Sequence, residues 1–564
     1  MSAKRLIECV PNFSEGANTK LIKSITDQIE TVKGVKLLDV DPGIATNRTV
    51  VTFVGEPDDV IEAAFLAIKR ASELIDMSQH KGEHPRMGAT DVCPLIPISN
   101  ITMEETVAYA KKLAKRVGEE LNIPVYLYES AARNEERKNL ANIRAGEYEG
   151  FGKKIKEAKW KPDFGPAEQH VKAGTTAIGA RDFLVAYNVN LNTTSVRKAN
   201  SIAFDIREKG RVKREGHPVN GTILRDAAGD PLRVPGMLKS VKAIGWYIDE
   251  YKVAQISMNL PDIKVTSLHE AFEATCTSAQ NRGIRVTGSE LVGLVPKKVM
   301  IDAGQYFLKK QGKSIGIAES EIIHIAIKSL GLDELGPFDP KAKIIEYLLE
   351  DESDRPLVHK TVRQLADETA SESPAPGGGS IAAYSGALGA ALGTMVANLS
   401  SVKRGWDDKW EYFSDYARQG QQLKDELLFL VDEDTHAFNN IIDAIRLPKS
   451  TDVEKSERKN AIEAATKNAI EIPLKVMQAA YNNYALIKVM CDSGNPASIS
   501  DVGVGALCTH TAVHGAYLNV IINCKDLKDA DYIKAKLAEA DALLLQSADM
   551  QKEILAQVES VIKS

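Results

Sequence analysis

The sequence has few cysteines and no cysteine motif. Its six cysteines are scattered along the chain, at Cys9, Cys93, Cys276, Cys491, Cys508 and Cys524. No two of them form a C-x-x-C pair, so neither a zinc knuckle nor a thiol redox motif is indicated. Disulfide frameworks are typical of small secreted domains, and the size and cysteine spacing of this chain argue against one.

The chain also lacks an excess of basic charge. Its formal net charge is -6 with both signs interspersed, which argues against a nucleic-acid-binding surface. The start, M-S-A-K-R-L-I-E-C-V, has no long apolar stretch of the kind that a signal peptide needs. We therefore expect a cytoplasmic protein.

Only one segment is apolar enough to raise the question of a membrane. From Ile381 to Ser401 there is no charged residue, and Gly389 and Gly393 form a G-x-x-x-G pattern. The length would span a bilayer, but Ala, Gly and Ser predominate over the large residues that drive insertion. We predict a soluble helix that packs closely against its neighbours, with no membrane contact.

The first half of the chain alternates between strand and helix patterns. Over the whole chain, hydrophobic residues make up 44% and charged residues 26%, an ordinary globular balance. The order over Leu6–Tyr128 is β-α-β-β-α-β, which predicts a sheet of ferredoxin type. A second unit begins with the alternating strand Phe183–Leu191 and includes a hairpin pattern within residues 243–258. Between these, residues 211–238 have low periodicity and are predicted to be a surface loop.

The second half changes character after Leu349. The charged stretch L-E-D-E-S-D-R-P has no apolar periodicity and is typical of a linker. Beyond it the spacing is helical almost throughout, which predicts an α-helical bundle. We therefore predict a multidomain α/β and all-α protein. Its parts are two ferredoxin-like subdomains at residues 1–183 and 184–348, a linker at 349–356, and a helical bundle domain at 357–564.

The loop from His80 to Asp91, H-K-G-E-H-P-R-M-G-A-T-D, crowds two imidazoles, two carboxylates and a guanidinium between a helix and a strand. Histidine titrates near neutral pH, and a scaffold can present such a loop to a ligand, so we predict acid–base work by His84. Two alternatives stay open. One is a surface turn with incidental histidines. The other is an inverted zinc-peptidase motif, which Gly82 and Pro85 disfavour because they oppose the helix that it needs.

Other polar residues of the first half are weaker candidates. Asp39 and Asp41 share one face at a strand end, and Arg48 opens the next strand; such residues face a ligand or simply cap turns. The bridge Trp160–Ala180 is long for a connector, which favours a ligand contact. Several lysines precede or open it, forming either a solvated helix end or a basic patch for an anionic small molecule: Lys153, Lys154, Lys156, Lys159 and Lys161.

In the helical half, three glycines of S-P-A-P-G-G-G-S (Ser373–Ser380) precede a helix. Free N–H groups at a helix start can meet an anion or a polar ring, and a tight structural turn explains the residues equally well. The segment Ser373–Ser380 contains no G-K-[ST], so it is not a nucleotide P-loop. A further polar cluster, Cys491–Asp501, either completes a pocket or caps the helix that follows.

Asp434 is a sharper candidate. Helical steps from Val431 through Phe438 to Ile445 place it on an apolar stripe, whereas Asp432 falls on the other face. A buried carboxylate is costly unless it is hydrogen-bonded or functional, and burial raises its pKa toward useful acid–base values. The alternative is an aspartate with a purely structural role.

Taken together, these motifs resemble the formimidoyltransferase–cyclodeaminase family, the bifunctional folate enzymes of histidine breakdown, over nearly the whole chain. Each motif is weak alone and the set is specific. The motifs are E-C-V-P-N-F-S-E-G (Glu8–Gly16), L-L-D-V-D with T-N-R-T-V (Thr46–Val50), H-K-G-E-H-P-R-M-G, P-V-Y-L-Y (Pro124–Tyr128), I-R-A-G-E-Y-E (Ile143–Glu149), P-D-F-G-P (Pro162–Pro166), A-P-G-G-G-S, L-V-D-E-D and G-A-Y-L-N-V (Gly515–Val520).

The resemblance implies one catalytic residue in each half, with folate bound between the two α/β subdomains. The second histidine of H-K-G-E-H is His84, the implied acid–base of the transferase. The second aspartate of L-V-D-E-D is Asp434, the implied catalytic residue of the cyclodeaminase. The expected substrate-binding residues are Asp41, Arg48, Gly165, Pro166, Ala167, Glu168, Gln169, His170, Val171, Lys172, Ala173, Gly174, Gly377, Gly378, Gly379 and Ser380.

The family chemistry implies two consecutive reactions. N5 of tetrahydrofolate takes the formimino carbon of N-formimino-L-glutamate and glutamate leaves. N10 then closes on that carbon and ammonia leaves, giving 5,10-methenyltetrahydrofolate. The implied co-substrate is polyglutamylated tetrahydrofolate, with no metal, no nucleic acid and no membrane. The implied assembly is a homo-oligomer, a ring of dimers that forms an octamer.

Three alternatives to this function remain. The same fold would serve another formimino donor, such as formiminoglycine. A non-catalytic folate-binding scaffold is the second alternative. The third is a zinc hydrolase built on His80, Glu83 and His84. The excursion at residues 211–238 looks longer than in the vertebrate members, which puts the loops of the second subdomain in doubt.

Overall fold

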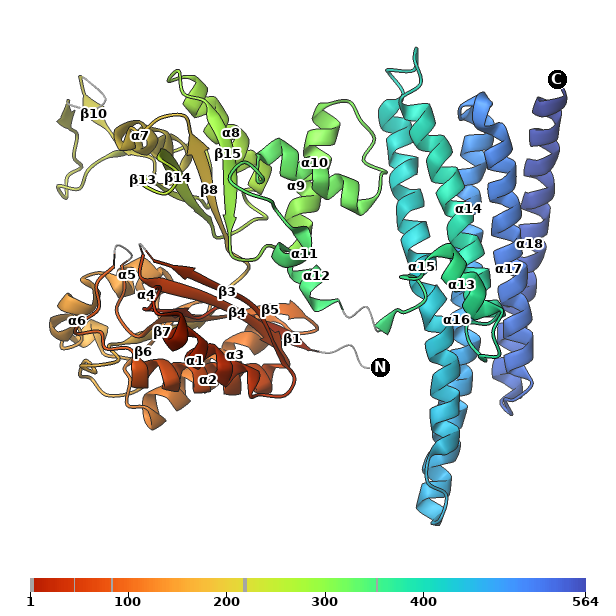
Figure 1. Cartoon of the computed structure of the whole chain (residues 1–564), viewed down its shortest axis with the longest axis horizontal. Coiled ribbons are helices and arrows are strands. Elements are labelled where there is room, and N and C mark those ends of the chain that lie inside the picture. The colour runs from red at the N-terminus through yellow and green to blue at the C-terminus, as the bar shows by residue number, and fades with distance from the viewer. Residues whose placement is uncertain (1–4, 45, 83–84, 217–220, 351–353) are drawn as a thin grey trace. The chain divides into compact units, whose positions relative to one another are not determined.

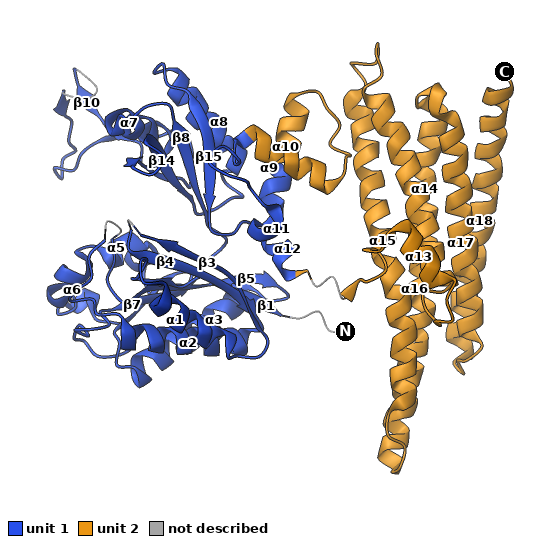
Figure 2. Cartoon of the chain, in the orientation of Figure 1, with its two compact units in different colours: residues 1–302, 330–349 blue, residues 303–329, 350–564 orange. Residues whose placement is uncertain are grey.

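The computed structural model (Figure 1) describes residues 5–44, 46–82, 85–216, 221–350 and 354–564. The chain divides into two compact units, residues 1–302 with 330–349 and residues 303–329 with 350–564 (Figure 2). The first unit is α/β and the second is helical, so the predicted fold class is confirmed.

The first α/β layer is a ferredoxin-like sheet that has been extended at one edge. Strands β1 and β2 both lie between β4 and β5, and β3 pairs with β4, which gives the predicted split arrangement. Strands β7 and β6 add a parallel extension beyond β5. The elements are β1 (Leu6–Cys9), β2 (Asn12–Phe13), α1 (Thr19–Glu30), β3 (Val35–Gly43), β4 (Arg48–Gly55), α2 (Pro57–Leu74), β5 (Thr90–Ser99), α3 (Met103–Glu120), β6 (Val125–Glu129), α4 (Glu135–Lys138), α5 (Leu140–Arg144), α6 (Glu147–Lys154) and β7 (Thr176–Ala180).

Alternation along the strands decides which residues are buried beneath the helices. Ile7, Cys9 and Phe53 join the core formed with α1, α2 and α3. The register pairs Asp39 with Thr52 and Asp41 with Val50, so both aspartates lie on one face, as the alternation predicted.

The second α/β layer repeats the ferredoxin arrangement, with strand order β13-β14-β8-β15. The hairpin pattern within residues 243–258 is confirmed as β13 and β14. The predicted irregular loop at 211–238 instead contains two small ladders, β9 with β12 and β10 with β11. The elements are β8 (Val185–Leu191), α7 (Val196–Ile206), β9 (Arg211–Val212), β10 (Arg214–Glu215), β11 (Thr222–Ile223), β12 (Arg233–Val234), β13 (Lys242–Ile248), β14 (Val253–Leu260), α8 (Leu268–Gln280), β15 (Val286–Val292), α11 (Pro340–Lys343) and α12 (Ile345–Leu349).

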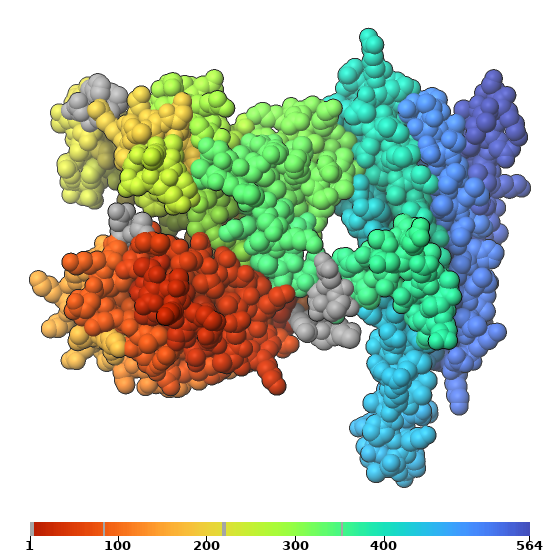
Figure 3. Space-filling view, in the orientation of Figure 1, coloured from red at the N-terminus to blue at the C-terminus, as the bar shows by residue number. Residues whose placement is uncertain are grey.

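The helical unit is a bundle of long antiparallel helices. It includes the second half of α9 and most of α10, which pack with the bundle although they precede the predicted linker. Helices α15 and α16 extend past the others as a two-helix hairpin (Figure 3). The elements are α9 (Lys297–Lys310), α10 (Glu319–Leu330), α13 (Val362–Thr369), α14 (Gly378–Ser401), α15 (Trp410–Arg446), α16 (Asp452–Ser493), α17 (Ile499–Cys524) and α18 (Ala530–Lys563).

Helix α14 is the one described helix that is long and apolar enough to cross a membrane, and 61% of its most apolar window is buried inside the protein. Its glycines permit close approach to α17. A Cβ atom on Gly389 would stand 2.5 Å from Oγ1 of Thr509 and 3.0 Å from the carbonyl oxygen of Gly505. The small residues therefore serve helix packing in the bundle, as predicted.

Two candidate active sites

Asn47 joins three sequence motifs beside the start of β4. Its side-chain oxygen accepts the N–H of Gly16 at 3.0 Å, and its amide donates to the carbonyl of Lys81 at 2.7 Å. Gly82 allows the two segments to approach this closely, since a Cβ atom on it would stand 2.5 Å from the carbonyl oxygen of Thr46. The H-K-G segment of the histidine loop is therefore packed onto the T-N-R turn.

Arg86 anchors the same loop after its second histidine. Its guanidinium is almost fully buried and binds Glu147 at 3.0 Å and Glu149 at 2.7 Å. It also donates to Nδ1 of His80 at 3.2 Å. Nε2 of His80 lies 3.0 Å from the carbonyl of Asn47, and because a carbonyl only accepts, Nε2 carries the proton. Both ring nitrogens of His80 are occupied, which argues against this imidazole as a zinc ligand.

Glu83 and His84 lie outside the described residues, so the catalytic role of His84 stays a prediction. The residues before and after them are held by the contacts of Gly82 and Arg86. Sequence reasoning did not single out Arg86 as the anchor. Its two carboxylate partners, Glu147 and Glu149, lie in the I-R-A-G-E-Y-E motif. The presence of this motif together with the histidine motif was the one sequence feature that could have indicated the contact.

A buried charge cluster lies beside the histidine loop. The fully buried carboxylate of Asp91 accepts the N–H of Met87 at 3.0 Å and the guanidinium of Arg144 at 2.6 Å. Burial lowers the pKa of Arg48 to about 10, and the charges of Asp91 and Asp41 oppose this shift. The structure thus brings the predicted binding residues Asp41 and Arg48 close to each other and to the histidine loop.

The predicted folate segment, Gly165–Gly174, meets the histidine loop at its C-terminal end. Ala89 donates to the carbonyl of Ala173 at 2.8 Å, and Gly88 and Gly174 form an isolated bridge. Gln169 donates to the carbonyl of Tyr148 at 2.7 Å. Most of the segment between these contacts is exposed. Two separate stretches that the sequence proposed for one site are therefore neighbours.

The lysine patch near Trp160 is smaller than the sequence suggested. Lys154 is one of the five lysines, and it donates to three carbonyl groups, those of Asn142, Ile143 and Ala145. It also lies 4.1 Å from the ring centre of Trp160, and burial lowers its pKa to about 8. This lysine stabilises the turn before α6 and does not contribute to a surface for anions.

The second candidate site lies where α15 passes the first turn of α14. Gly378, Gly379 and Ser380 form that turn, and Gly377 caps it. The hydroxyl of Ser380 donates to the carboxylate of Asp434 at 3.1 Å. Burial raises the pKa of Asp434, and its hydrogen bonds with Ser380 partly offset that rise. The glycine-rich segment and the apolar-face aspartate, 54 positions apart between Ser380 and Asp434, thus form one acid site.

Gly379 sets the fit between the helix start and the carboxylate. A Cβ atom there would stand 2.5 Å from the carboxyl carbon of Asp434. We predict that Gly379→Ala displaces Asp434 and lowers ammonia release at least about tenfold, because small misplacements of reacting groups are costly. Gly505→Ala on α17 is the matched control, since its Cβ would lie 3.4 Å from the nearest atom, the carbonyl oxygen of Gly389. Assays of ammonia release and transfer check this, and equal loss in both variants would contradict it.

The face of α15 that carries Asp432 is buried, although the sequence pattern indicated that the apolar stripe on the other face would be the buried one. Asp432 is 1% exposed, whereas Phe438 and Ile445 are 36% and 46% exposed. The carboxylate of Asp432 accepts the N–H groups of Leu357 at 2.9 Å and Val358 at 3.2 Å. The segment that enters the helical unit covers this face of α15, and a helical projection of α15 alone does not contain that segment.

Asp432→Ala is expected to destabilise the helical unit by about 1–3 kcal/mol, because two backbone donors lose their buried partner. Chemical denaturation followed by circular dichroism measures this change. Asp443→Ala serves as a control, since Asp443 is exposed on the same helix. A variant at Asp432 as stable as the control would show that water replaces the lost acceptor.

The polar cluster Cys491–Asp501 does not belong to the acid site. The N–H of Asn495 donates to the hydroxyl of Ser400 at 2.8 Å, near the C-terminal end of α14. The side chain of Asn495 accepts from Ala497 at 3.3 Å, which caps the short helical turn before α17. Of the two interpretations of this cluster, capping is the one that the contacts support.

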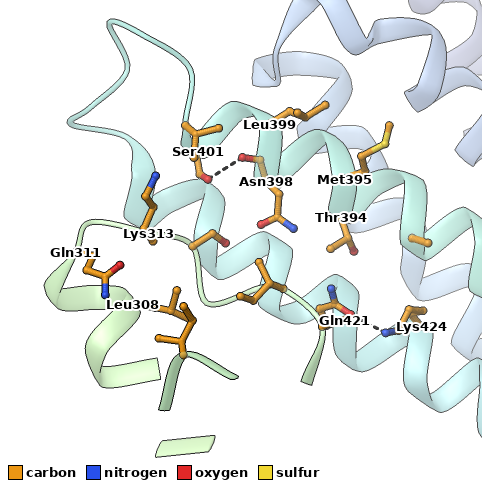
Figure 4. A pocket seen from close by; sticks show the side chains of 16 residues that line it. Leu308, Gln311, Lys313, Thr394, Met395, Asn398, Leu399, Ser401, Gln421 and Lys424 are labelled. Carbon is orange, nitrogen blue, oxygen red and sulfur yellow. Dashed lines mark hydrogen bonds between the residues drawn. The ribbon is translucent and has the colours of Figure 1, made fainter. Parts of the chain in front are cut away.

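A cavity of about 670 Å³ opens between the α9–α10 connection and helices α14 and α15 (Figure 4). Beside it, Asn398 and Gln421 both donate to the carbonyl of Gly316, at 2.8 Å and 3.1 Å. The cavity borders residues 391–401 of α14, whereas Asp434 contacts the first turn of that helix. It is therefore separate from the acid site.

Comparison with known proteins shows similarity along nearly the whole chain. The formiminotransferase N-terminal subdomain, the formiminotransferase domain and formiminotransferase-cyclodeaminase match residues 6–181, 186–350 and 361–542. Formimidoyltransferase-cyclodeaminase of Gallus gallus is 44% identical over 96% of this chain and 97% of its own length. Glutamate formimidoyltransferase of Streptococcus pyogenes serotype M1 is 42% identical over 54% and 94%. Methenyltetrahydrofolate cyclohydrolase of Methylorubrum extorquens is 33% identical over 36% and 98%.

Proposed function

The chain belongs to the formiminotransferase-cyclodeaminase family, and we propose that it performs the two reactions with His84 in the α/β unit and Asp434 in the helical unit. It is a bifunctional folate enzyme, a glutamate formimidoyltransferase joined to a cyclodeaminase. The first activity moves the formimino group from N-formimino-L-glutamate to tetrahydrofolate and releases L-glutamate. The second cyclises 5-formimidoyltetrahydrofolate to 5,10-methenyltetrahydrofolate and releases ammonia.

In the transfer step, N5 of tetrahydrofolate attacks the formimino carbon and the carbon–nitrogen bond to glutamate breaks. A base must remove the N5 proton and an acid must protonate the departing amine. One imidazole performs both tasks in turn, and we assign them to His84. The contacts of Asn47 and Arg86 support this assignment because they fix the loop on either side of it.

In the cyclising step, N10 closes on the same carbon and the bond to the leaving nitrogen breaks. The observation that carries this assignment is the half-buried Asp434 bound to Ser380, whose raised pKa favours the protonated acid. That acid protonates the departing ammonia. The resulting carboxylate then faces a product that carries positive charge, which it stabilises.

The test is incubation of the protein with N-formimino-L-glutamate and tetrahydrofolate. The expected result is near-ultraviolet absorbance of the methenyl product together with one ammonia and one glutamate per turnover. Formiminoglycine offered in parallel measures donor preference. Folate binding without glutamate or ammonia release would instead support the non-catalytic scaffold.

A second candidate reaction for the helical unit is hydrolysis of the methenyl product. The relative from Methylorubrum extorquens is named methenyltetrahydrofolate cyclohydrolase. Water in place of ammonia would add to the same carbon and the bond to N5 would break, with Asp434 as the base. Supplied 5,10-methenyltetrahydrofolate should then lose its absorbance faster with the protein than with the Asp434→Asn variant.

Finer properties are also proposed. We infer that the folate is polyglutamylated and that the enzyme is a cytoplasmic homo-oligomer, an octameric ring of dimers. Six free cysteines fit a reducing compartment. Exposed large apolar side chains on two bundle helices fit a subunit interface: Leu388, Met395, Leu399, Val504, Leu507, Leu518 and Ile522. Light scattering of the purified protein and rates with mono- and polyglutamylated folate test these points.

A further inference from the structure

The second ferredoxin-like sheet carries a polar row on the face away from α7 and α8. On the helix side, Thr275 of α8 contacts Met258 of β14. By alternation, the neighbouring Gln255 points to the other face. The register sets Trp246 opposite Gln255 and Glu290 opposite Asn188, on adjacent strands. Polar residues from four neighbouring strands therefore share one face of this sheet.

These residues hold the carboxylate of Glu290 in one place. Its Oε2 accepts the amides of Asn188 at 3.2 Å and Gln255 at 3.3 Å, and its Oε1 accepts the hydroxyl of Tyr251 at 3.3 Å. Gln255 is fully buried and is itself fixed by the indole N–H of Trp246 at 2.8 Å. The carboxylate is thus pre-positioned by side chains that are themselves constrained.

No cation balances this carboxylate in the part of the chain that the structure describes. Glu290 forms no ion pair there, and its three donors are neutral. A second carboxylate, Glu334, accepts the amide of Asn190 at 2.9 Å on the same face. A carboxylate has about four acceptor positions, so one position on Glu290 is left for a ligand. A half-buried anion without a counter-charge is costly, and a bound cation would offset that cost.

We propose that Glu290 binds the formimino group of the donor substrate in its protonated, amidinium form. This inference rests on the proposed transferase function. An amidinium is a planar cation with N–H groups, and one of these can donate a charge-assisted hydrogen bond to the position of Glu290 that is left. Contact with Glu290 keeps the group protonated and its carbon electrophilic until N5 attacks. Glu290 is therefore a specificity residue for a cationic donor.

Tyr251 connects this network to the candidate transferase site. Burial and the neighbouring carboxylates raise its pKa to about 12, so its hydroxyl remains a donor at neutral pH. Asp41 contributes to that shift together with Glu290. The charges of Glu290 and Asp41 therefore act on the same hydroxyl within the first unit.

The experiment compares steady-state transfer by the wild-type protein and Glu290→Gln, with each substrate varied in turn. We expect KM for N-formimino-L-glutamate to rise about tenfold to hundredfold, as for loss of a charged hydrogen bond. KM for tetrahydrofolate should not change. The rate of ammonia release from supplied 5-formimidoyltetrahydrofolate should also stay the same. Glu290→Asp keeps the charge and should recover part of the donor affinity.

Glu215→Gln is the matched control, an exposed carboxylate on β10 outside this network, and it should behave as wild type. If KM for tetrahydrofolate rises instead, or neither KM changes, the proposal is overturned. Competition on the wild-type protein is independent of variant folding. Neutral N-formyl-L-glutamate should bind at least about tenfold more weakly than the amidine, and equal binding refutes the proposal. If the wild-type protein binds the amidine but does not transfer its formimino group, the proposed transferase function is wrong, whereas the proposed binding role of Glu290 stands.

Discussion

Replacing His84 with alanine is expected to lower formimino transfer by about a hundredfold to ten-thousandfold, the usual contribution of a positioned acid–base group. Ammonia release from supplied 5-formimidoyltetrahydrofolate should be unchanged, because that step takes place in the helical unit. Separate assays of glutamate and ammonia release measure the two effects. Added imidazole should restore part of the transfer rate, a recovery that a purely structural role would not give.

His80 provides the contrast within the same loop. Its ring is held by Arg86 and by the carbonyl of Asn47, so it positions the loop without donating a catalytic proton. His80→Ala should lower transfer without any rescue by imidazole. If His84→Ala transfers normally, the acid–base assignment is wrong. If transfer and ammonia release fall together while the fold survives, the division into two sites is wrong.

Replacing Asp434 with asparagine is expected to have the converse effect, with ammonia release lowered by a similar factor of about a hundredfold or more. Transfer should continue, so 5-formimidoyltetrahydrofolate should accumulate. Asparagine keeps the size of the side chain and can still accept from Ser380, so the local packing is preserved. Product analysis by chromatography checks this outcome. A variant that still forms the methenyl product at the normal rate would remove Asp434 from the mechanism.

The raised pKa of Asp434 gives this prediction a pH dependence. The wild-type rate of cyclisation should fall as pH rises through the raised pKa, because the acid form is lost, and the residual rate of Asp434→Asn should lack this decline. The stability of the folded protein should change with pH in the same direction as the rate. Between the unfolded and the raised folded pKa, the folded state binds more protons, so stability falls with rising pH. At neutral pH, Asp434→Asn should therefore be at least as resistant to heat as the wild type.

Local sequence patterns were sufficient for the elements and for part of each site. Period-2 alternation placed Asp39 and Asp41 on one face, and the register confirms it. Helical spacing predicted all the long helices of the second half, although α14 starts at Gly378, where the sequence suggested a turn. These predictions succeed because strand and helix periodicity depend on residues close together in the chain.

The partners of these residues depended on the tertiary structure. Helical phase put Asp434 on an apolar stripe, but only packing brought the first turn of α14 against it. The same phase put Asp432 off that stripe but did not reveal that a distant segment covers its face and buries it. Glu290 gave no signal in the sequence, since its donors come from other strands and a turn. The sequence by itself determined the folds, the family and the candidate groups for proton transfer. Which groups meet was decided by contacts between segments far apart in the chain, which local periodicity does not encode.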